Sequence, residues 1–215
     1  MRLRWNAHVM LALCGLPVMA RLLPGFDLLA DGFVAAVTLC LAAMLPDFDR
    51  VEGLDQVPGY LTGVWRRTLA GCVVLYPLFL VARYMNGWRP VTPDLGLMLL
   101  LLVLVVASFV VLAIAFALLT RLLGLAHRKL LHSLVLPVTG AAAAMIEGIP
   151  IIVPVAFVLG FGSHALADAL TPSGVYPFYP LSTRRISLDV VRTGGWGERS
   201  FLVVFFITFV ALSIF

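Results

Sequence analysis

The sequence predicts an all-α fold, a polytopic membrane helix bundle with about six or seven transmembrane helices. Hydrophobic residues make up 62% of the 215 residues and charged residues only 12%, with a mean hydropathy of +1.06. A soluble domain carries about 25% charged residues. Long apolar stretches recur along the whole chain between short polar turns. The length suits a single integral-membrane domain, residues 1–215, without a separate soluble domain.

Proline, glycine and charged residues delimit the first three predicted helices. Residues 7–23 form an apolar run that ends at a proline–glycine turn. Residues 28–45 form the second, which ends at Pro46 because proline does not continue a helix. A polar loop over residues 50–67 then leads into a third helix, residues 68–84.

Three further helices and a final segment complete the predicted bundle. Residues 95–120 carry no charge and exceed the length needed to cross the roughly 30 Å hydrocarbon core, so this helix should tilt or protrude. Residues 130–146 and 149–170 form a hairpin around a tight glutamate–glycine turn. After a polar stretch, residues 171–199, the last apolar segment at 201–215 is barely long enough to span.

The distribution of basic residues predicts the orientation. If the helices alternate in direction, every Lys and Arg except Arg21, Arg83 and Arg89 falls on the side of the N-terminus. Cytoplasmic loops carry the excess of Lys and Arg, so we expect a multi-pass protein of the cytoplasmic (inner) membrane with a cytoplasmic N-terminus. The net charge of +4 then reflects topology, and no nucleic-acid partner is expected. The three cysteines show no CxxC spacing and predict neither a disulfide nor a thiolate metal site.

Ionisable residues gather at the cytoplasmic ends of the predicted helices. His164 and Asp168 are four residues apart on an apolar helix, so they share a face, and burying both in a membrane is costly. The hairpin places His132 opposite His164, and the first two helices bring an early histidine level with an aspartate. The candidate metal ligands are His8, Asp47, Asp49, His127, His132, His164 and Asp168.

This set of side chains indicates a metal-assisted reaction. Imidazole and carboxylate without thiolate suit Zn, Mn or Fe, and seven ligands would serve one or two divalent ions. Such a site can activate water and clamp an ester that is to be hydrolysed. The candidate catalytic residues are His127, His132 and Asp49. The candidate residues for binding an anionic head group are Arg128, Lys129, Arg184 and Arg185.

Each feature also has a structural interpretation. His8 at a helix end is typical of a capping or interfacial residue. Asp47 and Asp49 after a proline can form a turn. His164 and Asp168, which share a helix face, can also form a simple structural pair without a metal. Glu198, before the last apolar segment, is interpreted as a helix cap rather than a further ligand.

Three motifs resemble the YdjM-like family of inner-membrane, predicted metal-dependent hydrolases. They are LPDFD at residues 45–49, HRKLLHS at 127–133 and GFGSHALADALTPSGVYPFYPLSTRRISL at 160–188. The resemblance covers nearly the whole chain and implies a multi-span protein whose His/Asp metal site carries over to the seven candidate ligands. This chain has Arg50 where the family often has histidine, and Leu131 where threonine is usual.

These observations lead to a first hypothesis, a membrane-embedded metal-dependent hydrolase acting on a lipid-linked or membrane-delivered ester, with a phosphoester as first choice, at the cytoplasmic face. The alternatives are a non-enzymatic metal-binding membrane protein, such as a transporter or sensor, and a structural, partner-binding membrane protein. A transporter needs polar residues along a path to the opposite side, and the predicted helices 68–84 and 95–120 offer almost none. The expected partners are the bilayer and a lipid substrate; the sequence predicts no oligomeric state.

Overall fold

The protein is all-helical, as predicted. The computed structural model describes residues 5–28, 30–50, 57–85, 129–191 and 196–214, together with positions 103, 106–107, 109–111, 114–115 and 118. Within these residues the extended pairing is one isolated antiparallel bridge, between Val175 and Ile186. The predicted helix at 95–120 lies outside the described residues apart from those positions, which are helical.

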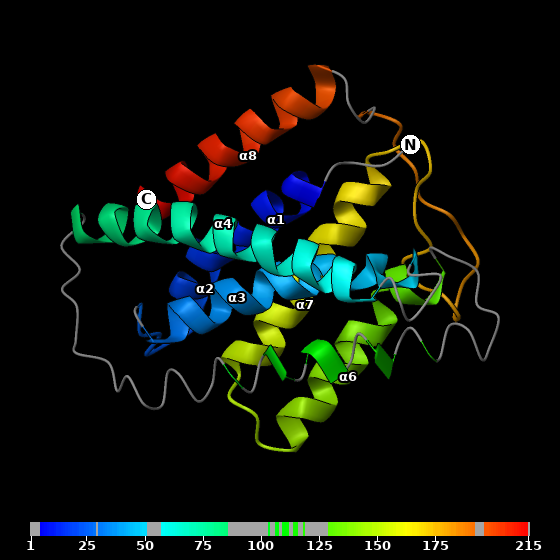
Figure 1. Ribbon diagram of the computed structural model, residues 1–215, viewed down its shortest axis with the longest axis horizontal. Coiled ribbons are helices and arrows are strands. Elements are labelled where there is room, and N and C mark those ends of the chain that lie inside the picture. Colours follow the sequence, from blue (N-terminus) through cyan, green and yellow to red (C-terminus); the bar gives the residue numbers. More distant parts are fainter. Residues whose placement is uncertain are drawn as a thin grey trace.

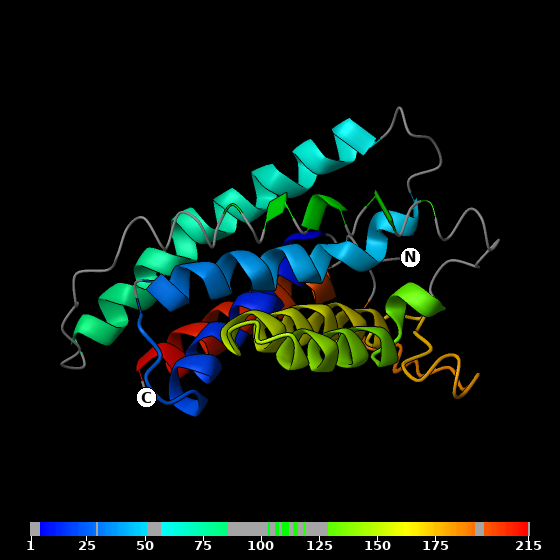
Figure 2. The same cartoon turned by 90° about the horizontal axis from the view of Figure 1, so that it is seen from below.

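Helix α3 lies at the centre of the described helices in both views (Figures 1 and 2). It packs against α1, α2, α4 and α7, and α7 also contacts α1, α2 and α6. Helix α8 lies against α1, α2 and α4. The elements in chain order are α1 (Trp5–Leu13), α2 (Gly15–Leu22), α3 (Ala30–Met44), the 3-10 helix η1 (Leu45–Arg50), α4 (Val57–Met85), the 3-10 turn η3 (Leu130–His132), α6 (Val135–Ile146), α7 (Ile152–Ala169) and α8 (Trp196–Ile214).

The start of helix α4 differs from its predicted position by more than any other helix end in the described residues. It begins at Val57, so most of the loop predicted at residues 50–67 is helical. The polar residues of this stretch suggested a loop, but Val64 is buried in the hydrophobic core and Leu61 packs against it. An amphipathic segment gains most of its helical stability from such tertiary packing rather than from its own propensity.

Other helix ends also differ from the predicted ones. The first predicted helix is two helices, α1 and α2, that meet at Cys14. The predicted helix 130–146 begins only at Val135, because residues 130–132 form the separate turn η3. Helix α8 begins at Trp196, five residues before the predicted start, and has 19 residues. The last helix is therefore longer than the apolar segment from which it was predicted.

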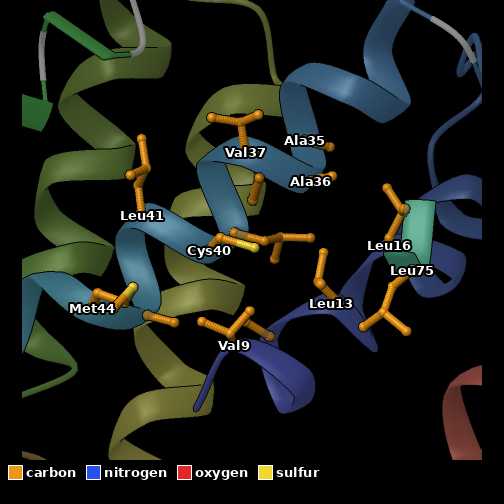
Figure 3. Close-up of a cluster of buried hydrophobic side chains, with 14 of the residues drawn as sticks. Val9, Leu13, Leu16, Ala35, Ala36, Val37, Cys40, Leu41, Met44 and Leu75 are labelled. Atoms are coloured by element: carbon orange, nitrogen blue, oxygen red, sulfur yellow. The ribbon is translucent and has the colours of Figure 1, made fainter. Parts of the chain in front are cut away.

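The hydrophobic core lies where α1, α2, α3 and α4 meet (Figure 3). Ala35, Ala36 and Cys40 of α3 and Val9 and Leu13 of α1 belong to this cluster, and all are buried. Small side chains let helices approach closely, which is how helices pack in membranes. The closest approach is at α7, where a Cβ on Gly160 would lie 2.9 Å from the Cβ of Ala42 and would collide with the backbone of α3.

Two of the described helices, α7 and α8, are long and apolar enough to cross a membrane, judged by length and composition. Their 18 and 19 residues correspond to about 27–29 Å, close to the thickness of the hydrocarbon core. Shorter apolar helices are found at residues 7–22 and in α6. The predicted number of six or seven spans stays a prediction.

Candidate metal centre

Five of the seven predicted ligands meet at one end of the fold, on four different elements. Helix α1 supplies one histidine, η1 an aspartate and η3 a histidine, while α7 supplies the remaining pair. Each is exposed by 2% or less of its surface. These residues, hereafter the His/Asp cluster, are His8, Asp47, His132, His164 and Asp168.

The distances between histidine nitrogens and carboxylate oxygens are nearly equal across the cluster. His132 Nε2 lies 3.6 Å from Oδ2 of Asp168 and 3.9 Å from Oδ1 of Asp47. His164 Nε2 lies 3.8 Å and 4.0 Å from the same two atoms. These separations exceed an N–H···O hydrogen bond of about 2.7–3.2 Å. They are close to the roughly 3.4 Å between two ligands that bind one tetrahedral ion at about 2.1 Å.

The ring of His164 is held in one orientation by its neighbours. Its Nδ1 lies 2.7 Å from the carbonyl oxygen of Ala43 at the end of α3. Because a carbonyl only accepts, Nδ1 donates the proton, and in a neutral ring the lone pair is then on Nε2, the atom that faces the carboxylates. Histidines that bind metals usually donate their other N–H to a carbonyl or carboxylate in this way. The ring also stacks on His8 at 4.2 Å and meets His132 edge-on at 5.0 Å.

Local sequence explains why α3 and α7 deliver these groups together. Gly160 allows the two helices to touch, and His164 stands one turn further along α7, beside Ala43. The 3-10 helix η1 follows directly after α3, with Pro46 as its second residue, and brings Asp47 to α7. The close packing of α3 and α7 thus brings Asp47, just after α3, near His164 on α7.

The donor set fits a divalent metal ion. Two overlapping groups, His8 with Asp47 and His164, and His132 with His164 and Asp168, each place one ligand atom per residue within 4.8 Å of the others. Imidazole and carboxylate ligands suit Zn, Mn or Fe. With neutral imidazoles the two carboxylates bring two negative charges into a buried volume, and a divalent cation would balance that charge.

Comparison with known families identifies the family of the chain. The model of the YdjM inner membrane protein family matches residues 4–215. The chain belongs to this family. The match covers nearly the whole sequence, confirms the resemblance seen in the motifs and identifies an inner membrane protein. No curated protein and no solved structure matches the chain.

Some predicted site residues of this YdjM-family chain lie away from the cluster or outside the described residues. His127 and Arg128 are outside, as is the side chain of Asp49, whose backbone belongs to η1. Lys129 directly precedes η3, with its Nζ 6.0 Å from the ring centroid of Tyr179. The other two predicted head-group residues, Arg184 and Arg185, are exposed between α7 and α8.

Glu198 is a further candidate that the sequence analysis assigned to a helix cap. It lies in the first turn of α8 and is 3% exposed. Leu202, four residues later and therefore on the same face of α8, packs against Ala7 and Ala167. Those alanines directly precede His8 and Asp168 in the sequence, so α8 packs against the segments that carry two members of the His/Asp cluster. An acid in the first turn of a helix suits a cap and a ligand equally, so the sequence could not distinguish the two.

Proposed function

We propose that this protein is a membrane-embedded, metal-dependent hydrolase that acts on a lipid-linked or membrane-delivered ester, with a phosphoester as first choice, at the cytoplasmic face. The observation behind this proposal is the His/Asp cluster, in which His164 Nε2 faces two buried carboxylates at 3.8 and 4.0 Å. A buried set of imidazoles and carboxylates from four elements suits a divalent ion better than it suits a single ion pair.

The cluster is proposed to hold one Zn, Mn or Fe ion. Both candidate ligand groups include His164, and its Nδ1 is engaged by Ala43, so this residue offers a single nitrogen. A second ion would need the side chains of Asp49 and His127, and both side chains lie outside the described part of the structure. When bound, a divalent ion supplies a Lewis acid that activates water and polarises the ester oxygen.

The residues of the chain would then bind the ion, transfer protons and attract the substrate. Asp47 and Asp168 would supply carboxylate ligands at the centre of the cluster. His132, whose ring is edge-on to that of His164, would either complete the ligand set or transfer a proton. His127 and Asp49 would also take part in proton transfer. Lys129, with Arg128, Arg184 and Arg185, would attract an anionic head group. We further propose six or seven membrane spans and a cytoplasmic N-terminus, which the distribution of arginines favours.

The burial of the cluster favours a second candidate function. His132, His164 and Asp168 are 0% exposed, whereas a hydrolytic site must admit its substrate. A metal-binding membrane protein without enzymatic activity, such as a sensor, needs no such access. The two candidates therefore share the metal and differ in turnover.

Metal analysis combined with a hydrolysis assay separates these functions. Protein purified in mild detergent without added metal should contain about one equivalent of Zn, Mn or Fe. It should release phosphate from phosphatidic acid in mixed micelles, and Asp168→Asn should abolish both properties. Asp189→Asn is the matched control, because Asp189 is exposed and its positive φ of 48° suits asparagine. Metal without hydrolysis would favour the second candidate, and protein without metal would contradict both.

A further inference from the structure

Residues 171–191, hereafter the α7–α8 loop, expose large apolar side chains. Leu181 is 80% exposed, Val190 61%, Leu188 59% and Phe178 53%. In a loop bathed in water, so many exposed apolar side chains in a short segment are unusual and mark a contact surface. Figure 2 shows this segment, in orange, extending beyond the ends of α6 and α7.

Hydrogen bonds hold the loop in a defined shape. Val175 and Ile186 exchange two backbone hydrogen bonds of 2.9 Å, and Ser187 Oγ donates to the carbonyl of Thr171 at 2.8 Å. The backbone N–H of Leu134, at the start of α6, donates to the carbonyl of Pro177 at 2.8 Å. The exposure of the apolar side chains is therefore built into the fold.

The end of the loop lies level with the last turn of α7. The N–H of Leu188 donates to the carbonyl of Ala169 at 2.8 Å, and that of Val190 to the carbonyl of Leu170 at 2.9 Å. Helix α7 is one of the two described helices with the length and composition to cross a membrane. The exposed side chains of Leu188 and Val190 thus stand at the level where α7 would leave the hydrocarbon core.

Basic residues accompany the apolar ones. Arg184 and Arg185 are exposed and lie between Leu181 and Leu188 in the sequence. Their positive charge complements the anionic lipids of the cytoplasmic leaflet. Exposed apolar side chains interspersed with arginine are typical of segments that lie in the head-group region. Long cationic side chains can reach the phosphates while their neighbours enter the acyl boundary.

We propose that the α7–α8 loop is a membrane-interface segment, in which Leu181, Leu188 and Val190 enter the acyl boundary of the leaflet and Arg184 and Arg185 bind lipid phosphates. A bilayer fits this surface better than a protein partner, because α7 and α8 flank the loop and would bring the membrane to both of its ends. The proposal shares Arg184 and Arg185 with the proposed function but requires neither a bound metal nor hydrolysis.

Spin labels on the loop test this directly. In a background in which the three cysteines are replaced by alanine, single cysteines are introduced as Leu181→Cys and Leu188→Cys, with Thr183→Cys as the exposed polar neighbour. The full chain is reconstituted in phosphatidylglycerol/phosphatidylethanolamine vesicles. Labels at 181 and 188 should collide more often with oxygen, which concentrates in the bilayer, than with a water-soluble nickel chelate. The label at 183 should show a lower ratio of oxygen to chelate collisions.

Charge dependence gives the second measurement. Adding Arg184→Gln and Arg185→Gln to the Leu181→Cys variant should lower the collision ratio in phosphatidylglycerol vesicles and leave it unchanged in phosphatidylcholine vesicles. Preferential collision of both apolar positions with the nickel chelate in pure lipid vesicles would overturn the proposal. Labels that become shielded only after another protein is added would replace it with a protein-docking surface. Neither result would alter the metal content, so failure here is distinct from failure of the proposed function.

Discussion

Helices α7 and α8 are alike in length and hydropathy, yet their surroundings differ sharply. Their most apolar 18-residue stretches have mean hydropathies of 1.5 and 1.8, but 56% of the stretch in α7 is buried and only 22% of the stretch in α8. Helix α7 is surrounded by α1, α2, α3 and α6 and carries His164 and Asp168 inward. Helix α8 lies at the edge of the described structure (Figure 1) and exposes residues such as Val203 and Ile207.

The difference shows where a membrane protein can keep ionisable groups. A carboxylate facing lipid costs several kcal/mol, whereas one that faces other helices can be hydrogen-bonded or can bind an ion. Only the helix enclosed by others carries the buried histidine and aspartate within its last turns. In α8 the one buried acid, Glu198, lies in the first turn, where the helix meets α1 and the α7–α8 loop.

The largest contrast between the two helices should be in metal binding. His164→Ala removes a proposed ligand from α7, and metal content should fall to less than about a tenth of wild type, since even the loss of an outer-shell partner costs 10–100-fold. Ser213→Ala, which removes a buried hydroxyl from α8, should leave the metal in place. Elemental analysis of the purified variants measures both.

A purely structural pair of His164 and Asp168, without a metal, makes a different prediction for the same residues. If His164 and Asp168 only pair with each other, the double variant His164→Ala/Asp168→Ala should recover stability that either single variant loses. That recovery, in protein that never contained metal, would contradict the metal site.

Deleting apolar atoms should cost much more stability next to α7 than on α8. Leu39→Ala empties space in α3 at the contact with α7, where Leu39 is 0% exposed, and should lower the free energy of unfolding by about 2–5 kcal/mol. Ile207→Ala on α8 should cost less than about 1 kcal/mol, because lipid or detergent refills the space at this 60% exposed position. Unfolding in mixed micelles with increasing SDS measures both, and equal losses would contradict the assigned burial.

Adding a side chain at the contact between α3 and α7 should have a moderate effect on stability and on metal binding. Gly160→Ala inserts a methyl group against Ala42, and overpacking of this kind costs about 1–3 kcal/mol. The displaced helix should also strain the bond from His164 to Ala43 and weaken metal binding by about tenfold or more. Gly140→Ala on α6, where nothing lies within 4 Å of the added Cβ, should stabilise the protein by up to about 1 kcal/mol. Chelator competition gives the affinity, and an unchanged value for Gly160→Ala would show that its contact does not position the site.

The smallest effect is expected at the start of α8. Glu198→Gln changes a buried acid in the first turn of α8, the helix that packs against the segments carrying His8 and Asp168, and metal affinity should fall by up to about tenfold. Glu147→Gln, in the exposed turn between α6 and α7, is the control and should change nothing. A loss of thermal stability without any change in affinity would identify Glu198 as a helix cap.

Several features could be predicted from local sequence because they depend on spacing alone. Apolar runs interrupted by proline and glycine predicted the all-helical fold, and the motif around His164 predicted the family. The four-residue spacing placed His164 and Asp168 on one face, and the short turn after α6 placed His132 opposite them. Such relations hold in any context in which the helices form.

Other features depended on which helices meet, and only the tertiary structure determined them. The start of α4 follows from the burial of Val64 against the core, and the orientation of His164 follows from a carbonyl on α3, 121 residues away in sequence. The different surroundings of α7 and α8 could not be predicted from the sequence either. Lipid tails are as apolar as leucine, so hydropathy is the same for a helix that faces lipid and one that faces other helices. Small residues that fit against a neighbour, such as Gly160 against α3, decide which of the two becomes the interior.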